Sequence, residues 1–227
     1  MNDFYDHELR GRARTETPAL RRDGIAGWVD RLDPATRERL QFFGAFLREP
    51  LTVGSLLPSS AVLAEAMIER CDLESSATVV ELGPGTGAFT GLILDRLRPE
   101  ATFFALELND RHVEGLRRRF PGLAVHNDSA ERIRGYLERY GKPKADYVFS
   151  GLPWGNFPAS LQDQIMTQVV SALSPEGLFV TFAYVHALRL PKARRFRRML
   201  HGMFRKVEQS PVVWRNFPPA VVYRCRV

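Results

Sequence analysis

Cysteine is scarce in this chain of 227 residues, and its scarcity excludes two kinds of stabilising element. The two cysteines, Cys71 and Cys225, are too few for a disulfide framework. Neither has a histidine or a second cysteine at the spacing of metal ligands, so the sequence predicts no metal site. This pattern favours a protein of the reducing cytoplasm.

Long hydrophobic runs are also missing. The longest apolar region, Leu178 to Leu190, is interrupted by Tyr184, His186 and Arg189, and it is too short to cross a bilayer. The N-terminal residues are polar and acidic, unlike a signal peptide. We therefore expect a cytoplasmic protein. Its net charge of +6 leaves nucleic acid or an anionic membrane surface as partners.

Acidic residues are absent from Gly177 to Val207, a region rich in arginine. Its apolar residues recur at helical spacing, which predicts a cationic amphipathic helix of the kind that lies on membranes. A nucleic-acid surface would use the same arginines on phosphates but would expose aromatic rings for stacking. A solvated basic face on a core helix is a third interpretation. We favour peripheral binding to the inner face of the cell membrane through Trp28, Arg194, Arg195, Phe196, Arg197, Arg198 and Met199.

Two short amphipathic helices are expected near the N-terminus. Apolar residues recur at helical spacing from Ile25 to Leu32 and again from Leu40 to Leu47. These helices either cover the core of a fold that begins later, or lie against lipid or close over a ligand. We assign residues 1–50 to this helical extension and residues 51–227 to the main domain.

From about residue 61 the sequence alternates between helical and strand patterns, which is typical of a parallel sheet covered by helices on both faces. The expected fold is α/β, a doubly wound Rossmann-like sheet of five parallel strands with an antiparallel C-terminal hairpin. The expected strands are 77–82, 101–106, 124–126, 146–150, 177–184, 204–214 and 220–227. The expected helices are 61–71, 88–97, 110–120, 130–140, 159–173 and 192–201. We expect a monomer.

A glycine-rich segment follows the first expected strand and points to a ligand. Glu81 precedes Gly83, Gly85 and Gly87, and the spacing G-x-G-x-G differs from that of a dinucleotide loop. No Gly-Lys-Ser/Thr follows, which excludes a P-loop. An acid and a glycine loop without a lysine suit a cationic ligand without phosphate, and S-adenosylmethionine is the leading candidate. Its expected contacts are Ser59, Ser60, Glu81, Gly83, Gly85, Thr86, Gly87, Glu107, Leu108, Asp128, Ser129 and Ser150.

Two further acids end the second and third expected strands, where open α/β sheets bind ligands. Glu107 lies 20 positions after Gly87, the place of an acid that accepts hydrogen bonds from ribose. The alternative is an exposed acid that caps the next helix, for which Asn109 or Asp110 is better placed. Asp128 is expected to accept a hydrogen bond from the adenine amino group, or else to cap a helix.

The fourth expected strand ends in Ser150-Gly151-Leu152-Pro153-Trp154, which resembles the Asn-Pro-Pro-Tyr and Asn-Leu-Pro-Tyr loops of amine-directed methyltransferases. Glycine occupies the first position of the loop, so main-chain carbonyls, Ser150 and Asn156 are the available acceptors. Trp154 is expected to face a cation, or else to be buried in a rigid loop. Tyr184 and His186 are candidate proton acceptors.

From Phe42 onward the sequence resembles the bacterial phospholipid N-methyltransferases, which convert phosphatidylethanolamine to phosphatidylcholine. The resemblance rests on Pro58-Ser59-Ser60, the Glu81–Gly87 loop, Ser150–Pro153 and Arg215-Asn216-Phe217-Pro218-Pro219-Ala220. It implies a peripheral enzyme that uses S-adenosylmethionine and binds anionic membrane through amphipathic helices. The alternatives are a methyltransferase of another amine lipid such as ornithine lipid, an enzyme like the rRNA adenine dimethylases, and a membrane protein that binds the cofactor without catalysis.

Overall fold

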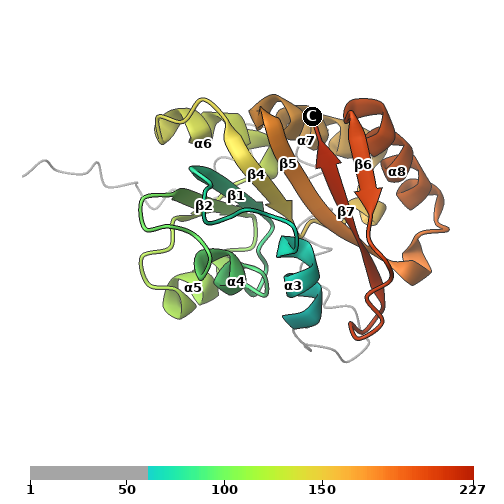
Figure 1. Ribbon diagram of the computed structural model, residues 1–227, viewed down its shortest axis with the longest axis horizontal. Coiled ribbons are helices and arrows are strands. Elements are labelled where there is room, and N and C mark those ends of the chain that lie inside the picture. The colour runs from blue at the N-terminus through green and yellow to red at the C-terminus, as the bar shows by residue number, and fades with distance from the viewer. Residues whose placement is uncertain (1–60) are drawn as a thin grey trace, which may run out of the picture. The chain divides into compact units, whose positions relative to one another are not determined.

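A single seven-stranded sheet organises the computed structural model, which describes residues 61–227 (Figure 1). The strand order is β3-β2-β1-β4-β5-β7-β6. The strands are β1 (Thr78–Leu82), β2 (Thr102–Glu107), β3 (Val125–Asn127), β4 (Ala145–Ser150), β5 (Leu173–Tyr184), β6 (Lys206–Gln209) and β7 (Ala220–Arg226). The strands from β3 to β5 pair in parallel, and β7 pairs antiparallel with both β5 and β6. The predicted α/β sheet with its C-terminal hairpin is confirmed.

Helices cover both faces of this sheet (Figure 1). One face carries α3 (Ala61–Ile68), α4 (Thr90–Leu94) and α5 (Asp110–Arg119). The other face carries α6 (Ile133–Arg139), α7 (Ala159–Ala172) and α8 (Pro191–Met203). Alternate residues of each strand point to opposite faces, so β1 packs Val79 against α3 and α4 and turns Val80 to the other side. Burial of apolar side chains on both faces explains why the central strands are almost continuously hydrophobic.

The order of the strands reverses between β1 and β4. The chain proceeds outward from β1 through β2 to β3, then returns to place β4 against the other side of β1. Val80 therefore lies between Phe104 of β2 and Val148 of β4. In open α/β sheets the crevice at such a reversal, outside the carboxyl ends of the strands, is where ligands bind.

Several element boundaries differ from the predicted ones for local reasons. The turn after the glycines reaches Phe89, so α4 is shorter than the predicted helix. The predicted helix at 130–140 is divided into a 3₁₀ turn, η1 (Ala130–Arg132), and α6. The predicted strand 204–214 is reduced to β6, because Pro211 lacks an N–H group and the hydroxyl of Ser210 accepts from Val222 N at 2.9 Å. A long link, residues 210–219, therefore joins β6 to β7.

The predicted extension 1–50, Trp28, and the predicted cofactor contacts Ser59 and Ser60 lie outside the described residues. Within residues 61–227, no helix has the length and apolar character needed to cross a bilayer. The same part of the chain contains no group of three histidine, cysteine or carboxylate side chains arranged to hold a metal ion.

Candidate active site

The glycine loop joins β1 to α4 at the carboxyl edge of the sheet. Gly83, Gly85 and Gly87 have φ angles of 67°, 58° and 83°, in the left-handed region that glycine occupies without strain. A Cβ atom on Gly87 would also lie 2.8 Å from side-chain atoms of Leu116 and Phe120. The backbone conformation therefore favours glycine at all three positions, and at Gly87 the packing of Leu116 and Phe120 leaves no room for a side chain.

Glu81 is fully buried beneath this loop. Its Oε2 accepts a hydrogen bond from the Thr90 hydroxyl at 2.7 Å, whereas Oε1 has no partner among the described residues. Burial raises the pKa of Glu81 to about 7, the Thr90 hydrogen bond opposes this rise, and nearby Glu107 adds to it. A buried carboxylate oxygen without a partner is costly unless a donor or a cation reaches it. Glu81 therefore fits a cationic cofactor.

Glu107 joins the glycine loop to the end of β2. Its Oε2 accepts from Gly85 N at 3.0 Å and its Oε1 accepts from Asn109 N at 2.9 Å. The residue is 3% exposed, and a carboxylate has about four lone-pair sites, so acceptor capacity remains for ribose hydroxyls. Asn109, not Glu107, caps α5 by accepting from the N–H groups of Arg111 and His112. The capping alternative for Glu107 is therefore wrong.

His112 is a neighbour of Glu107 that the sequence did not single out. Its Nδ1 lies 3.9 Å from Glu107 Oε2. Glu107 raises the pKa of His112, and partial burial opposes that rise. It lies in the first turn of α5, so this helix places an imidazole beside Glu107.

The end of β3 brings Asp128 and Ser129 to the same edge. Asp128 accepts from Ser129 N at 2.8 Å and from the Tyr136 hydroxyl at 3.1 Å, while the Ser129 side chain caps η1. The predicted capping role thus belongs to Ser129. Asn127, which the sequence did not flag, donates from Nδ2 to the carbonyls of Glu107 at 3.1 Å and of Leu108 at 3.0 Å. It holds the ends of β2 and β3 together.

The loop after β4 crosses the glycine loop at Gly151. Gly151 N donates to Leu82 O at 2.9 Å, and a Cβ atom at this position would lie 2.4 Å from the carbonyl oxygen of Gly83. Because that oxygen belongs to the backbone, it cannot move aside cheaply. This contact explains why the chain has glycine where related loops have asparagine.

Ser150 and Trp154 hold this loop together rather than facing outward. Ser150 is fully buried, and its Oγ accepts from Leu152 N at 3.3 Å and from Trp154 Nε1 at 3.1 Å. The Trp154 ring is stacked on Phe196 of α8 with centroids 4.7 Å apart, and Trp154 is 2% exposed. The expectation that Trp154 faces a cation is therefore wrong, and its alternative, a rigid loop with a buried tryptophan, describes the structure. Pro153 leads into the short 3₁₀ turn η2 (Trp154–Asn156).

Tyr184 and His186 lie at the end of β5. Their rings are stacked with centroids 5.7 Å apart, and His186 is exposed. Ser150 pairs with Thr181 in the sheet, so β5 continues past the end of β4 and brings both rings to the carboxyl edge. The structure places them at the expected edge.

The apolar face of α8 is not available to lipid. Phe196 is 3% exposed and Leu200 is fully buried, and both pack into the protein. Arg195 binds Gln162 and forms an ion pair with Asp163 on α7, and Met199 is half-buried. The prediction that this helix inserts its apolar face into a membrane is wrong, because the same periodicity also describes a helix that packs on its own sheet.

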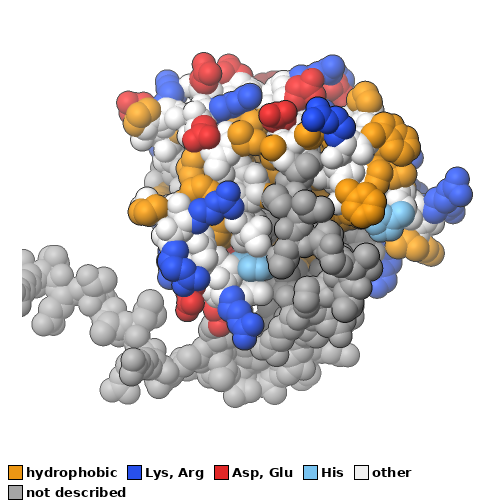
Figure 2. All heavy atoms as spheres, turned by 90° about the horizontal axis from the view of Figure 1, so that it is seen from below, with side chains coloured by type: hydrophobic (Ala, Val, Ile, Leu, Met, Phe, Trp, Pro, Cys, Tyr) orange, Lys and Arg blue, Asp and Glu red, His pale blue; other side chains and the backbone are white. Residues whose placement is uncertain are grey.

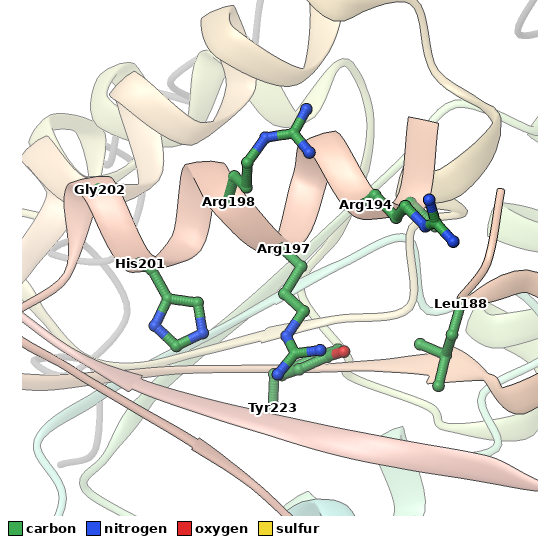
Figure 3. Close-up of a pocket in the computed structure, with 8 residues that line it drawn as sticks. Leu188, Arg194, Arg197, Arg198, His201, Gly202 and Tyr223 are labelled. Carbon is green, nitrogen blue, oxygen red and sulfur yellow. The ribbon is translucent and has the colours of Figure 1, made fainter. Parts of the chain in front are cut away.

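The basic face of α8 stays exposed. Arg194, Arg197 and Arg198 border a cavity of about 740 Å³ between α8 and β7, together with His201 and Tyr223. Figure 3 shows Arg197 and His201 pointing from α8 toward Tyr223, whereas Arg198 points away from it. Burial raises the pKa of Tyr223, and Arg197 opposes that rise. The side chains of these arginines form no ion pair with any residue in the described part of the chain.

Comparison with known proteins gives two kinds of relative. No protein-family model matches the chain. It is 33% identical over 188 residues to an ornithine lipid N-methyltransferase from Singulisphaera acidiphila, a match that covers 82% of this chain and 94% of that protein. It is 31% identical over 114 residues to the ribosomal RNA small subunit methyltransferase A of a Synechococcus species, which covers 49% of this chain and 40% of that protein.

Solved structures share the fold at low sequence identity. The O-methyltransferase TomG from Streptomyces achromogenes, in complex with S-adenosylmethionine, has a TM-score of 0.56 at 18% identity and covers 89% of this chain and 95% of that chain. An O-methyltransferase from Bacillus cereus has a TM-score of 0.55 at 14% identity, with coverages of 88% and 96%.

The strand order and the glycine loop with its two buried acids are those of the class I S-adenosylmethionine-dependent methyltransferase fold, and the 33% identity to a curated N-methyltransferase over 82% of this chain shows a methyltransferase. This confirms the enzyme class and the cofactor that the sequence predicted. The chain belongs to the family of the ornithine lipid N-methyltransferase from Singulisphaera acidiphila. Ornithine lipid was the alternative acceptor in the prediction, and phosphatidylethanolamine was the favoured one.

Proposed function

We propose that this chain transfers a methyl group from S-adenosylmethionine to the amine of a membrane lipid headgroup, and that an ornithine lipid is favoured over phosphatidylethanolamine. The observation that carries this proposal is the match to the ornithine lipid N-methyltransferase, which spans 94% of that protein. A match covering 82% of this chain necessarily contains both the Glu81–Gly87 loop and the Ser150–Trp154 loop. The similarity therefore includes both loops that this proposal assigns to the cofactor and to the acceptor.

The cofactor is held by groups on β1, β2 and β3. Glu81 offers its unpartnered Oε1 to a positive charge, Glu107 accepts from ribose, and Asp128 accepts from the adenine amine. When bound, S-adenosylmethionine supplies an electrophilic methyl group on a sulfonium. Orientation against the acceptor provides much of the acceleration, because a reaction between two molecules then becomes effectively intramolecular.

The acceptor amine is held by the loop after β4. Ser150 and Trp154 fix the loop from within, so that the Gly151 and Leu152 carbonyls can accept from the amine. An alkyl amine with a pKa of roughly 10.4 is neutral in about one molecule in a few thousand at pH 7. Its nitrogen must lose a proton before its lone pair is free to accept a methyl group. Tyr184 or His186, at the same edge, accepts that proton.

The membrane contribution of α8 is electrostatic. Arg194, Arg197 and Arg198 are exposed and unpaired with described residues, which supports binding to the anionic surface of the inner membrane leaflet. Phe196 and Arg195 do not take part, because both are held within the protein. The protein would then act as a peripheral monomer whose substrate stays in the membrane.

Methyl transfer to defined vesicles tests the assignment. Purified full-length protein with labelled S-adenosylmethionine would be given phosphatidylglycerol vesicles containing ornithine lipid, phosphatidylethanolamine or neither. We expect label in the ornithine lipid first and little or none in the vesicles without an amine lipid. Label in phosphatidylethanolamine alone would reverse the order of the two substrates. Absence of label in both lipids would refute lipid N-methylation.

A second candidate, methylation of adenine in ribosomal RNA, is favoured by the match to the Synechococcus enzyme. That match covers only 40% of the relative, and Gly151 replaces the asparagine that opens the corresponding loop in the rRNA adenine dimethylases. Adding ribosomal RNA as a third acceptor in the same assay distinguishes the candidates. Transfer to RNA with no transfer to lipid would establish the second function.

A further inference from the structure

Three large hydrophobic side chains stand out of the described surface. Leu190 is 49% exposed, Trp214 is 73% exposed and Phe217 is 72% exposed. Single exposed apolar residues are common and need no explanation. These three are different because they come from only two segments: the junction between β5 and α8, and the link between β6 and β7.

The two segments are joined to each other at the carboxyl end of β5. Val185 N donates to Pro219 O at 2.8 Å, and Ala220 pairs with Tyr184 where β7 begins. This is the edge of the sheet that carries the glycine loop and the loop after β4. On the face in Figure 2, hydrophobic side chains gather at the right, the side on which Figure 1 places both segments.

The link holds its aromatic rings outward by an internal anchor. Asn216 lies between Trp214 and Phe217 in sequence, yet it is 1% exposed. Its Nδ2 donates to Pro218 O at 2.7 Å, and its backbone N–H donates to Val213 O at 3.2 Å. Because the central residue is fixed inside, the two rings are displayed on a defined turn and not on a frayed end.

The charge around these rings is positive. Arg215 stands between them, and Arg189 precedes Leu190, and both arginines are exposed. From Gly177 to the last residue of the sequence, Glu208 is the single acidic residue. Exposed tryptophan and phenylalanine among arginines would also suit stacking on nucleic-acid bases, but the third exposed side chain, Leu190, has no ring to stack. The three side chains together form the composition that binds the interface of anionic membranes. An anionic bilayer neutralises this excess of positive charge, whereas a protein partner would have to supply a matching group of acidic side chains.

We propose that the β6–β7 link inserts Trp214 and Phe217, together with Leu190, into the headgroup region of an anionic bilayer. The insertion rests on the proposed function in one respect only, namely that the lipid substrate lies in the same headgroup region. Insertion at this edge turns the carboxyl ends of the strands toward the membrane. The headgroup amine then reaches the loop after β4 while its acyl chains remain in the bilayer.

Flotation with phosphatidylglycerol–phosphatidylcholine vesicles tests the insertion. We expect the full-length Trp214→Ala/Phe217→Ala variant to lose roughly tenfold or more in vesicle partitioning, because two apolar contacts are removed. Leu190→Ala should lose less, and its matched control Leu94→Ala, a half-buried leucine on α4, should be unchanged. Brominated lipids should quench part of the wild-type tryptophan fluorescence, and Trp214→Phe should remove that part.

A soluble substrate separates this proposal from the proposed function. Short-chain amine lipid below its micelle concentration should be methylated equally by the wild type and the double variant. Unchanged flotation of the double variant would overturn the insertion, as would loss of activity on the soluble lipid. Loss of self-association, measured by ultracentrifugation, without loss of flotation would assign the patch to a second copy instead. If the wild type methylates no lipid at all, only the proposed function fails, since flotation still reports on insertion.

Discussion

In the part of the sheet built from β1, β2 and β3, the charged groups that define the site are acids, and two of them are buried while Asp128 is half-buried. Glu81 is fully buried and Glu107 is 3% exposed, each with a hydrogen-bond partner in the protein. Along α8 and β7 the charges are basic and mostly arginines, and those of the basic face of α8 are exposed without ion-pair partners among described residues. Buried acids select a small cation, whereas exposed arginines suit an extended anionic surface.

The largest expected difference in stability is between substitutions of Trp154 and of Trp214. Trp154→Ala should lower the free energy of unfolding by roughly 3–5 kcal/mol, because it opens a cavity beneath α8. Trp214→Ala is the matched control, and it should change stability by less than about 0.5 kcal/mol, since the side chain is mostly exposed. Urea denaturation measures both. Equal losses in the two variants would contradict the burial that separates them.

Glu81 should make stability fall as the pH rises. Its folded pKa of about 7 exceeds the usual 4.5, so between these values the unfolded chain releases a proton that the folded chain keeps. For the cofactor-free protein, stability should therefore be about 3 kcal/mol lower at pH 8 than at pH 4.5 from this group alone. Glu81→Gln should remove this difference.

The measurement is the pH dependence of the unfolding midpoint in the wild type and the Glu81→Gln variant. The two curves should nearly coincide at pH 4.5 and below, diverge between pH 4.5 and about 7 with the variant the more stable, and stay separated at higher pH. Parallel curves across that range would show that Glu81 does not carry the dependence.

Glu107→Gln should weaken cofactor binding. The substitution removes the charge that accepts from Gly85 N and from the ribose, and hydrogen bonds to a charged group contribute about 1.5–3 kcal/mol. Isothermal titration should show a Kd roughly 10- to 100-fold higher. Glu114→Gln on the exposed surface of α5 is the control and should leave the Kd unchanged. An unchanged Kd for Glu107→Gln would remove the ribose role.

Gly151→Ala tests the place where the cofactor and acceptor loops touch. Its added Cβ would lie 2.4 Å from Gly83 O, and overpacking of this kind costs roughly 1–3 kcal/mol. We expect cofactor affinity and activity to fall together, because the strain reaches both loops. Gly115→Ala, where a Cβ would meet nothing within 4 Å, is the control. A loss of activity with normal cofactor affinity would show that the strain stays in the acceptor loop.

Arg197→Gln should give the smallest effect. One arginine near an anionic leaflet contributes about 1 kcal/mol, or about fivefold in vesicle partitioning, and added salt should weaken this contribution. Arg111→Gln, an exposed arginine on α5, is the control and should have no effect. Equal binding of the two variants at low salt would remove α8 from the membrane-binding surface.

The cofactor part was predictable because its constraints are local. Positive φ angles at Gly83, Gly85 and Gly87 favour a residue without a side chain. The number of residues between this loop and Glu107 is set by the one helix and one strand that lie between them. The spacing of the glycines therefore carries the geometry. His112 and Asn127 were missed because their roles depend on contacts between elements, which leave no local pattern.

The region of α8 and the β6–β7 link was predicted less well, because periodicity does not say what an apolar face contacts. Phe196 and Leu200 recur as they would in a membrane-bound helix, but they pack against Trp154 and the sheet. Trp214 was predicted to end a strand, and Phe217 lies in the link without periodicity, so no pattern drew attention to their exposure.

Arg224 links the two ends of the described chain in a way that bears on the order of folding. Its side chain, 6% exposed on β7, donates to the carbonyls of Ala66 and Glu69 at the C-terminal end of α3. Helix ends leave carbonyls that need donors, and here the donor is 155 residues away from Glu69. During synthesis α3 emerges early, but the donor for the carbonyl groups at its C-terminal end arrives only with β7. Contacts of such separation slow folding, so the end of α3, the first helix of the described residues, is completed only when β7 has formed.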